Sequence, residues 1–231
     1  MTPETFFGRV NALLSGNPLY PADAPVMARI AKVGIKAGVA FPWNRFSPEI
    51  QAAIADGVKD GLAEIRATPM GEKINGWQMT MDMGRFGTKY ALRAANTLVA
   101  VGGNPAEDAL YPLATKDSTG APLDGAHRYR LAFSGKPPVD AFWSVYIYNT
   151  EGFFVENPVN RSMLGSRSEL NYGPDGSLTI AVQADQPTDV PESNWLPAPK
   201  AGPFMIAMRL YRPRPEIISH IWQPPTVKRV D

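Results

Sequence analysis

The sequence predicts an α+β protein in which a helical subdomain over residues 1–105 precedes an antiparallel β-sandwich or barrel over residues 106–231. Apolar residues recur at helical spacing through the first hundred positions. From about residue 105, short alternating runs are separated by Gly, Pro, Asn or Asp, which is typical of antiparallel sheets. The chain also holds 23 prolines in 231 residues, twice the usual ~5%, and so many fixed turns argue against an all-helical bundle.

Four segments with apolar residues three or four positions apart are expected to be helices: Pro3–Leu14, residues 24–37, a segment whose stripe runs from Ile50 to Ile65, and residues 83–101. The third helix has the clearest start. It begins with Ser47-Pro48-Glu49. The Ser47 hydroxyl can cap the helix, Pro48 suits the first helical position, and Glu49 lies near the positive end of the helix dipole. The fourth helix should end at Gly102-Gly103-Asn104-Pro105.

The runs expected to be strands are Tyr129–Phe133, residues 141–148, residues 178–182 and Phe204–Tyr211, with weaker runs over residues 152–155 and 217–222. A tight turn is expected at Gly173-Pro174-Asp175-Gly176, since proline presets φ and glycine accepts a positive φ. A second turn over residues 149–152 should join its flanking runs as a hairpin.

Composition and charge exclude several classes of function. Lys and Arg number 23 and Asp and Glu 22, so the net charge gives no reason to expect nucleic acid as a partner. Without cysteine there can be no thiolate metal site, iron–sulfur cluster or cysteine nucleophile. The two histidines, His127 and His220, lack the spacing of metal ligands. We therefore expect neither a metal nor a cofactor.

Targeting signals are absent from the sequence as written. No apolar run is long enough to cross a membrane, and the first residues, Met1-Thr2-Pro3-Glu4-Thr5, lack the basic and apolar regions of a secretory signal. A cytoplasmic location is expected on that reading. A periplasmic location stays open if the chain is a fragment of a longer protein.

Strand parity points to a candidate ligand site. Successive side chains of a strand face opposite sides, so Trp143, Val145 and Ile147 should form one apolar face. If the runs are neighbours in one sheet, the other face collects Ser144, Tyr146, Tyr148, Gln183, Arg209 and Tyr211. Aromatic rings beside fixed polar groups suit a small polar or amphipathic ligand. The alternative is a structural face, covered by the N-terminal helices, whose hydroxyls bond to loops.

Two irregular loops supply further candidates. In the loop over residues 156–162, Asn157 and Arg161 would grasp a carboxylate or hydroxyls. Alternatively, Arg161 holds the loop by donating to backbone carbonyls. In the loop over residues 194–199, Trp195 would either wall a binding pocket or plug the end of the sandwich.

Established catalytic motifs are missing from the sequence. It contains no GxSxG elbow and no Walker loop. Its acidic residues fall mostly in expected turns, where Asp is usual for conformational reasons, so a glycosidase pair is weakly indicated. No catalytic residue is assigned and enzymatic activity is left open. If the chain is an enzyme, a tyrosine or Arg209 would be the acid or the electrostatic group.

Several strings of the sequence resemble one bacterial family. They are Pro137-Pro138-Val139-Asp140-Ala141-Phe142-Trp143-Ser144, Asn157-Pro158, Asn160-Arg161, Asp175-Gly176-Ser177-Leu178, Asn194-Trp195-Leu196-Pro197-Ala198-Pro199 and Arg209-Leu210-Tyr211. The family is known as domain of unknown function 1214, and it commonly forms the C-terminal half of proteins whose N-terminal half is domain of unknown function 1254. The resemblance implies helices followed by a jelly-roll-like β-sandwich. It implies little about activity.

Two hypotheses from different classes follow. The first is a protein that binds a small molecule, with a carbohydrate or polyol as the first ligand class and with hydrolysis left open, on the tyrosine-rich face and its loops. The second is an interaction module without catalytic activity. It would dock a separate partner domain related to domain of unknown function 1254, which this chain lacks.

Overall fold

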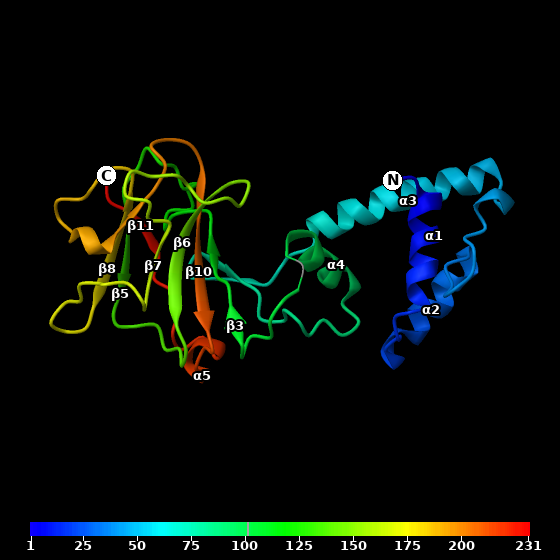
Figure 1. The fold of residues 1–231 in the computed structure, drawn as a ribbon, viewed down its shortest axis with the longest axis horizontal. Helices are drawn as coiled ribbons and strands as arrows, with labels where there is room; N and C mark the ends of the chain where they lie inside the picture. The colour runs from blue at the N-terminus through cyan, green and yellow to red at the C-terminus, as the bar shows by residue number, and fades with distance from the viewer. Residues whose placement is uncertain (101) are drawn as a thin grey trace. The chain divides into compact units, whose positions relative to one another are not determined.

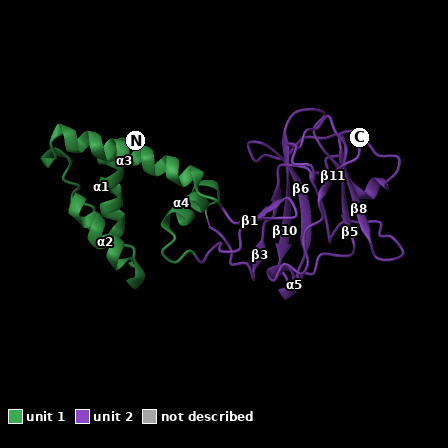
Figure 2. Ribbon diagram, turned by 180° about the vertical axis from the view of Figure 1, so that it is seen from behind, with its two compact units in different colours: residues 1–69, 86–101 green, residues 70–85, 102–231 purple. Residues whose placement is uncertain are grey.

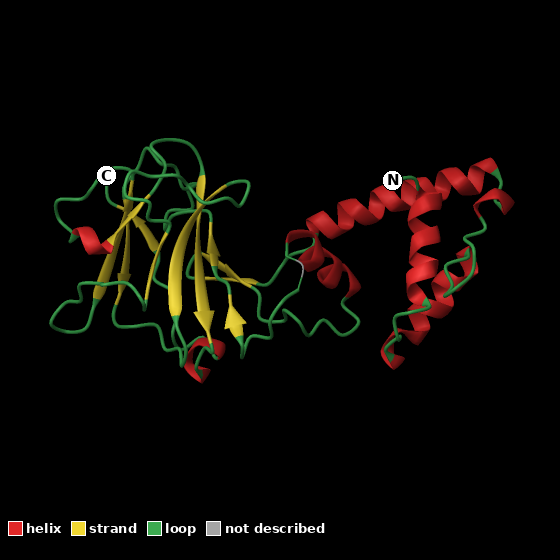
Figure 3. Ribbon diagram, in the orientation of Figure 1, coloured by secondary structure: helices red, strands yellow, loops and turns green. Residues whose placement is uncertain are grey.

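The computed structural model describes residues 1–100 and 102–231, which fall into two compact units. We call Met1–Pro69 with Phe86–Val101 the helical unit, and Met70–Arg85 with Gly102–Asp231 the sheet unit (Figure 2). An α+β organisation, with helices preceding two β-sheets, is therefore confirmed (Figures 1 and 3). Within the described residues, no helix combines the length and the apolar character that a membrane crossing requires.

The helical unit contains α1 (Pro3–Leu14), α2 (Ala24–Ile30), α3 (Pro48–Ala67) and α4 (Tyr90–Val99), with single 3-10 turns at Pro21–Asp23, Ala31–Val33 and Trp43–Arg45. The predicted start of α3 is confirmed. The Ser47 hydroxyl accepts a hydrogen bond from the backbone N–H of Ile50, at 3.4 Å, and Pro48 opens the helix. The span of α1 is the expected one, with Thr2 as its cap.

Two helices are shorter than their periodicity predicts. The second ends as an α-helix at Ile30 and closes with a 3-10 turn before Gly34, which takes a left-handed φ of 83°. The fourth begins at Tyr90 rather than residue 83, because Gly84 and Gly87 adopt φ values of 77° and 52° that a helix does not allow. Its predicted last residue, Val101, lies outside the described residues.

The sheet unit holds a larger antiparallel sheet and a smaller mixed one. The first has the strand order β1-β2-β4-β10-β6-β7, with β3 also pairing β10. Its strands are β1 (Glu72–Ile74), β2 (Trp77–Met79), β3 (Ala109–Leu110), β4 (Leu113–Ala114), β6 (Trp143–Asn149), β7 (Met163–Gly165) and β10 (Phe204–Tyr211). The second sheet has the order β11-β5-β8-β9, in which β8 and β9 run parallel. Its strands are β5 (Tyr129–Phe133), β8 (Leu178–Gln183), β9 (Trp195–Pro197) and β11 (Val227–Arg229).

One hydrophobic core joins the inner faces of both sheets. It includes Val145 and Ile206 from the first sheet and Leu131, Ile180 and Leu196 from the second. Along β10 the burial alternates strictly, as expected for a strand with one covered face. The alternation read from the sequence for 141–148 and Phe204–Tyr211 is confirmed.

Two weaker strand predictions are wrong. Residues 217–222 do not form a strand. The helix α5 (Pro215–Ile218), with Pro215 at its first position, takes up the first two of them. Residues 152–155 contribute only a single bridge, between Phe154 and Tyr148. The turn joining them to β6 is nevertheless present, since the N–H of Gly152 donates to the carbonyl of Asn149 at 3.1 Å and Gly152 has a φ of 86°.

The segment over residues 70–85, placed in the expected helical subdomain, belongs to the sheet unit. Strands β1 and β2 form a hairpin whose two connecting residues, Asn75 and Gly76, have φ values of 52° and 89°. Positive φ at both central residues is the geometry that an Asn-Gly hairpin turn requires. Trp77 and Met79 are buried in the shared core, which explains why this segment packs with the sheets.

Candidate functional site

The outer side of the larger sheet brings together five of the residues proposed from strand parity. Strands β6 and β10 pair directly, with Ser144 opposite Arg209. We call the set Ser144, Tyr146, Tyr148, Arg209 and Tyr211 the arginine–tyrosine face. Ser144 is only 3% exposed, so it supports the face from within, whereas the other four side chains are half-buried and reach its surface.

Arg209 is the centre of this face. Its Nη2 donates to the hydroxyl of Tyr148 at 2.7 Å, and its guanidinium carbon lies 4.3 Å from the centroid of the Tyr146 ring. A planar cation above an aromatic face is attracted by the ring quadrupole. The guanidinium is thus held between the Tyr146 ring and the Tyr148 hydroxyl rather than left free in solvent.

An aromatic surface surrounds the cation. The rings of Tyr146, Tyr148 and Phe154 stack on one another, with centroids 5.0–6.0 Å apart. Phe154 follows the turn after β6 and is 52% exposed. At the other end of the face, Tyr211 packs on Phe142 with centroids 4.5 Å apart. The alternation of residues along the strands could not assign Phe154 to the site. Phe154 reaches β6 only because the turn after β6 reverses the chain and pairs Phe154 with Tyr148.

The charge of Arg209 has no acidic counterpart. In the part of the chain that the structure describes, Arg209 makes no ion pair with an Asp or Glu side chain. Burial acts to lower the pKa of its guanidinium, but the adjacent Tyr148 and Tyr146 outweigh burial and raise that pKa above its ordinary value. The face therefore carries a permanent, half-buried positive charge beside Tyr146 and Tyr148.

Gln183 does not join this face, contrary to the parity argument. It ends β8, which lies in the other sheet, and its side-chain carbonyl accepts a hydrogen bond from Arg130. The assumption that all three runs are neighbours was wrong for this strand. Trp195 also lies in the smaller sheet: it is 4% exposed, and its indole N–H donates to the carbonyl of Gln183 at 2.9 Å.

Asn157 and Arg161 hold their own loop together. The Asn157 side chain donates to the carbonyls of Val155 and Arg161 and accepts from the N–H of Arg161. The Arg161 guanidinium donates to the carbonyls of Glu192 and Trp195, at 2.6 and 2.9 Å. This is the structural alternative considered from the sequence, and it leaves little of either side chain free for a ligand.

Three cavities have none of the residues of the arginine–tyrosine face in their walls. One of about 470 Å³ borders Arg130 and Tyr172 on the outer side of the smaller sheet. Another of about 520 Å³ borders Lys116 and Asp117. A third, of about 490 Å³, is apolar and belongs to the helical unit, where Phe7 and Gly61 are among its walls. The sequence carried no signal for these cavities, because each joins residues far apart along the chain.

The two histidines lie beside different carboxylates. His127 Nδ1 is 3.6 Å from Asp231, and His220 Nε2 is 3.3 Å from Glu72. Among the described residues, no group of three or more His, Asp or Glu side chains gathers as metal ligands would.

Comparison with known proteins identifies relatives of unknown function. Residues 108–215 match a family described as "Protein of unknown function (DUF1214)". The chain is similar to the solved structure of the VPA0106 protein from Vibrio parahaemolyticus, with 26% identity, a TM-score of 0.70, and coverage of 98% of this chain and 55% of that one. A putative uncharacterized protein from Burkholderia cenocepacia is similar at 13% identity and a TM-score of 0.38, covering 90% of this chain and 48% of that one. The chain thus spans about half the length of these solved structures. No curated protein matches.

Proposed function

We propose that this chain, which belongs to the DUF1214 family through its residues 108–215, binds a small ligand that carries an anionic group on the arginine–tyrosine face. The observation that carries the proposal is the charge of Arg209. It is half-buried, and among the described residues no carboxylate compensates it. A partly desolvated cation gains most from a ligand anion, since hydrogen bonds between charged groups are about twice as strong as neutral ones.

The aromatic rings suggest what adjoins the anion. Tyr146, Tyr148 and Phe154 present stacked rings on which the apolar face of a sugar or a planar ring can lie. Sugar acids combine such a ring with a carboxylate, so they are the first ligands to test among carbohydrates and polyols. We do not extend the proposal to hydrolysis, because the outward positions of β6 and β10 carry no His, Asp or Glu to serve as a general acid or base.

The test compares two probes of matched shape, D-glucuronate and D-glucose, by isothermal titration calorimetry on the full chain. We expect glucuronate to bind more tightly than glucose. Arg209→Met should weaken glucuronate binding by about 10- to 100-fold, because a charged hydrogen bond contributes about 1.5–3 kcal/mol.

The matched control for that test is Arg214→Met. Arg214 is 52% exposed and pairs with Asp140, so its loss changes the net charge equally and should leave binding unchanged. Thermal melts verify that both variants stay folded. Glucuronate binding that survives Arg209→Met, or no binding of glucuronate at all, would refute the proposal.

A second candidate function, docking of a partner domain, rests on the helical unit. None of the twenty described residues of α3 is buried, and Leu13 and Val99 are 66% and 65% exposed. Such apolar helix faces are usually covered by another protein surface. We take the occupant to be a partner domain, because about half of the solved Vibrio parahaemolyticus structure lies outside the match.

Docking predicts a loss of association without a loss of fold. Val58 lines the apolar cavity and is 38% exposed, so Val58→Asp should leave the melting temperature of this chain nearly unchanged. It should abolish co-elution with the part of the Vibrio parahaemolyticus protein that lies outside the match. Lys59→Asp, on the same helix and 75% exposed, is the control. Equal co-elution of both variants, or none with the unmodified chain, would count against docking.

For the fold, we retain the jelly-roll-like arrangement implied by the family resemblance as a proposal. Two sheets that share one core support it.

A further inference from the structure

The cavity of about 470 Å³ on the outer side of the smaller sheet is a candidate ligand site, separate from the arginine–tyrosine face. Arg130 of β5 and Thr179 of β8 reach this side because the alternate residues of both strands fill the core. We call it the Arg130–Tyr172 pocket; its polar walls include Arg130, Asn171, Tyr172, Thr179, Asp189 and Asn194. Its volume lies within the ~300–1,000 Å³ range of small-molecule sites.

The walls of the pocket are fixed by a buried amide. Asn194 is 2% exposed, and its Nδ2 donates to the carbonyls of Asn171 and Thr179 at 2.7 and 3.1 Å. Its Oδ1 accepts from the N–H of Asn171 at 2.8 Å. These bonds tie the backbone of Asn171 and of Thr179 to one buried side chain, so the pocket is formed before a ligand arrives, which reduces the entropy cost of binding.

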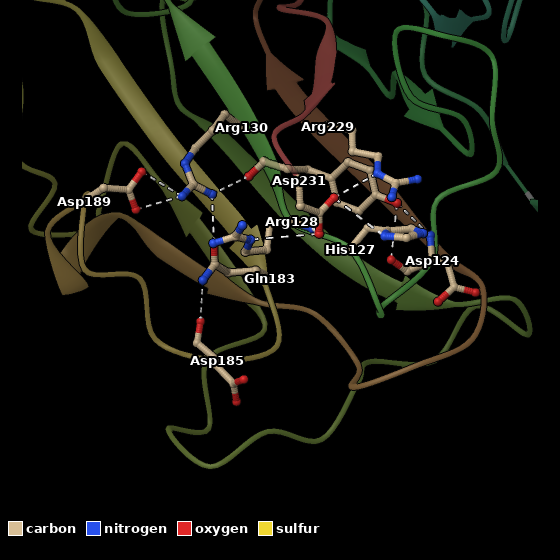
Figure 4. Close-up of polar contacts among 10 residues, drawn as sticks. Asp124, His127, Arg128, Arg130, Gln183, Asp185, Asp189, Arg229 and Asp231 are labelled. Carbon is tan, nitrogen blue, oxygen red and sulfur yellow. Dashed lines mark hydrogen bonds and ion pairs between the residues drawn. The ribbon is translucent and has the colours of Figure 1, made fainter.

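The charges inside the pocket cancel. The Arg130 guanidinium donates to both carboxylate oxygens of Asp189, at 2.8 and 2.9 Å, and to Gln183 (Figure 4). This hydrogen bonding from Arg130 is the main cause that lowers the pKa of Asp189, so the carboxylate stays ionised. An anionic ligand gains nothing from a cation that is already paired in this way, in contrast to Arg209.

Several polar groups in the pocket remain open. The bonds to Asn194 use only the backbone of Asn171 and Thr179. Within residues 1–100 and 102–231, no hydrogen bond to another protein group is formed by the side-chain amide of Asn171 or by the hydroxyls of Thr179 and Tyr172. Burial raises the pKa of Tyr172, which keeps it a neutral phenol that can donate and accept. Asp189 is 64% exposed and has lone pairs that Arg130 does not use.

We propose that the Arg130–Tyr172 pocket binds a neutral polyhydroxylated molecule of the size of a monosaccharide. Each hydroxyl of such a molecule both donates and accepts a hydrogen bond, which matches open groups of both kinds on the walls. The Tyr172 ring borders the pocket and adds apolar surface for the C–H face of the ligand, while Lys136 Nζ lies 5.0 Å from the ring centroid. The pocket lies on the smaller sheet and takes a neutral ligand, whereas the arginine–tyrosine face lies on the larger sheet and takes an anionic one.

The experiment uses D-glucose, D-galactose, D-xylose and sorbitol as probes on the full chain. Titrations are followed by calorimetry and by ¹H–¹⁵N NMR. We expect at least one probe to bind and to shift the amide signals of residues 171–179 and 189–194. Thr179→Val and Tyr172→Phe each remove one open hydroxyl with little change of shape, and each should weaken that probe about fivefold to tenfold.

Tyr20→Phe is the matched control, because Tyr20 lies in the helical unit and is 72% exposed, and it should leave binding of the neutral probe unchanged. Melting temperatures of the three variants near that of the unmodified chain show that the fold is kept. The proposal is overturned if no probe shifts these amides, or if binding is the same in Thr179→Val, Tyr172→Phe and the unmodified chain. It is also overturned if Tyr20→Phe weakens binding of the neutral probe as much as Tyr172→Phe does.

Discussion

Trp77→Ala should lower the free energy of unfolding of the sheet unit by about 3–5 kcal/mol, the range for emptying a buried tryptophan site. Trp77 is fully buried, and its indole N–H donates to the carbonyl of Pro225 at 2.7 Å. The substitution leaves a cavity in the shared core and an unpaired carbonyl beside it. Urea denaturation followed by circular dichroism measures the loss.

Two companion variants separate the causes. Trp77→Phe keeps most of the ring but loses the hydrogen bond, so it should cost about 1–2 kcal/mol. Trp43→Ala, in a 3-10 turn of the helical unit, should leave the unfolding of the sheet unit unchanged. A loss below about 1 kcal/mol for Trp77→Ala would mean that residues 70–85 are not part of the sheet unit's core.

Gly165→Ala should destabilise the sheet unit by about 3 kcal/mol, the upper part of the range for overpacking. A Cβ at this position would lie 2.3 Å from the carbonyl oxygen of Trp143 and 2.8 Å from the Cα of Ser144. Both are backbone atoms of β6, which cannot move without disturbing its pairing with β10. Strand β7 must therefore shift, and amide exchange of residues 163–166 should accelerate.

Gly135→Ala is the matched control for this substitution. No atom lies within 4 Å of the position that its Cβ would take, so its effect should stay within about 0.5 kcal/mol. Equal stability of the two alanine variants would contradict this prediction. It would show that β7 can shift without loss of free energy of unfolding, and that the fold does not require the close approach of Gly165 to Ser144.

The arginine–tyrosine face shows which site residues can be predicted from the alternation of side chains along a strand. Tyr146, Tyr148, Arg209 and Tyr211 were grouped from the alternation of two runs, and β6 and β10 do pair. The same argument failed for Gln183, because parity places a side chain on a face but does not say which strands are neighbours. Whether these side chains bind a ligand stays a prediction.

Short sequence motifs and strand periodicity differed in how much of the secondary structure they could predict. The Asn75-Gly76 turn is visible in the sequence and could have indicated the hairpin β1–β2. Strands of two or three residues, such as β3, β7 and β9, have no readable period. The family resemblance drawn from the motifs is confirmed by the match over residues 108–215.

The sequence by itself determined the order of helices and sheets, the cap of α3, and the buried face of each long strand. These features depend on contacts within a few residues, and periodicity and turn chemistry record them. Only the tertiary structure decided the partner strands, the loop-fixing role of Arg161 and the walls of the Arg130–Tyr172 pocket. Those depend on backbone and side chains that lie far apart in the chain, for example Arg130 and Asp189, and no local pattern encodes which of them meet.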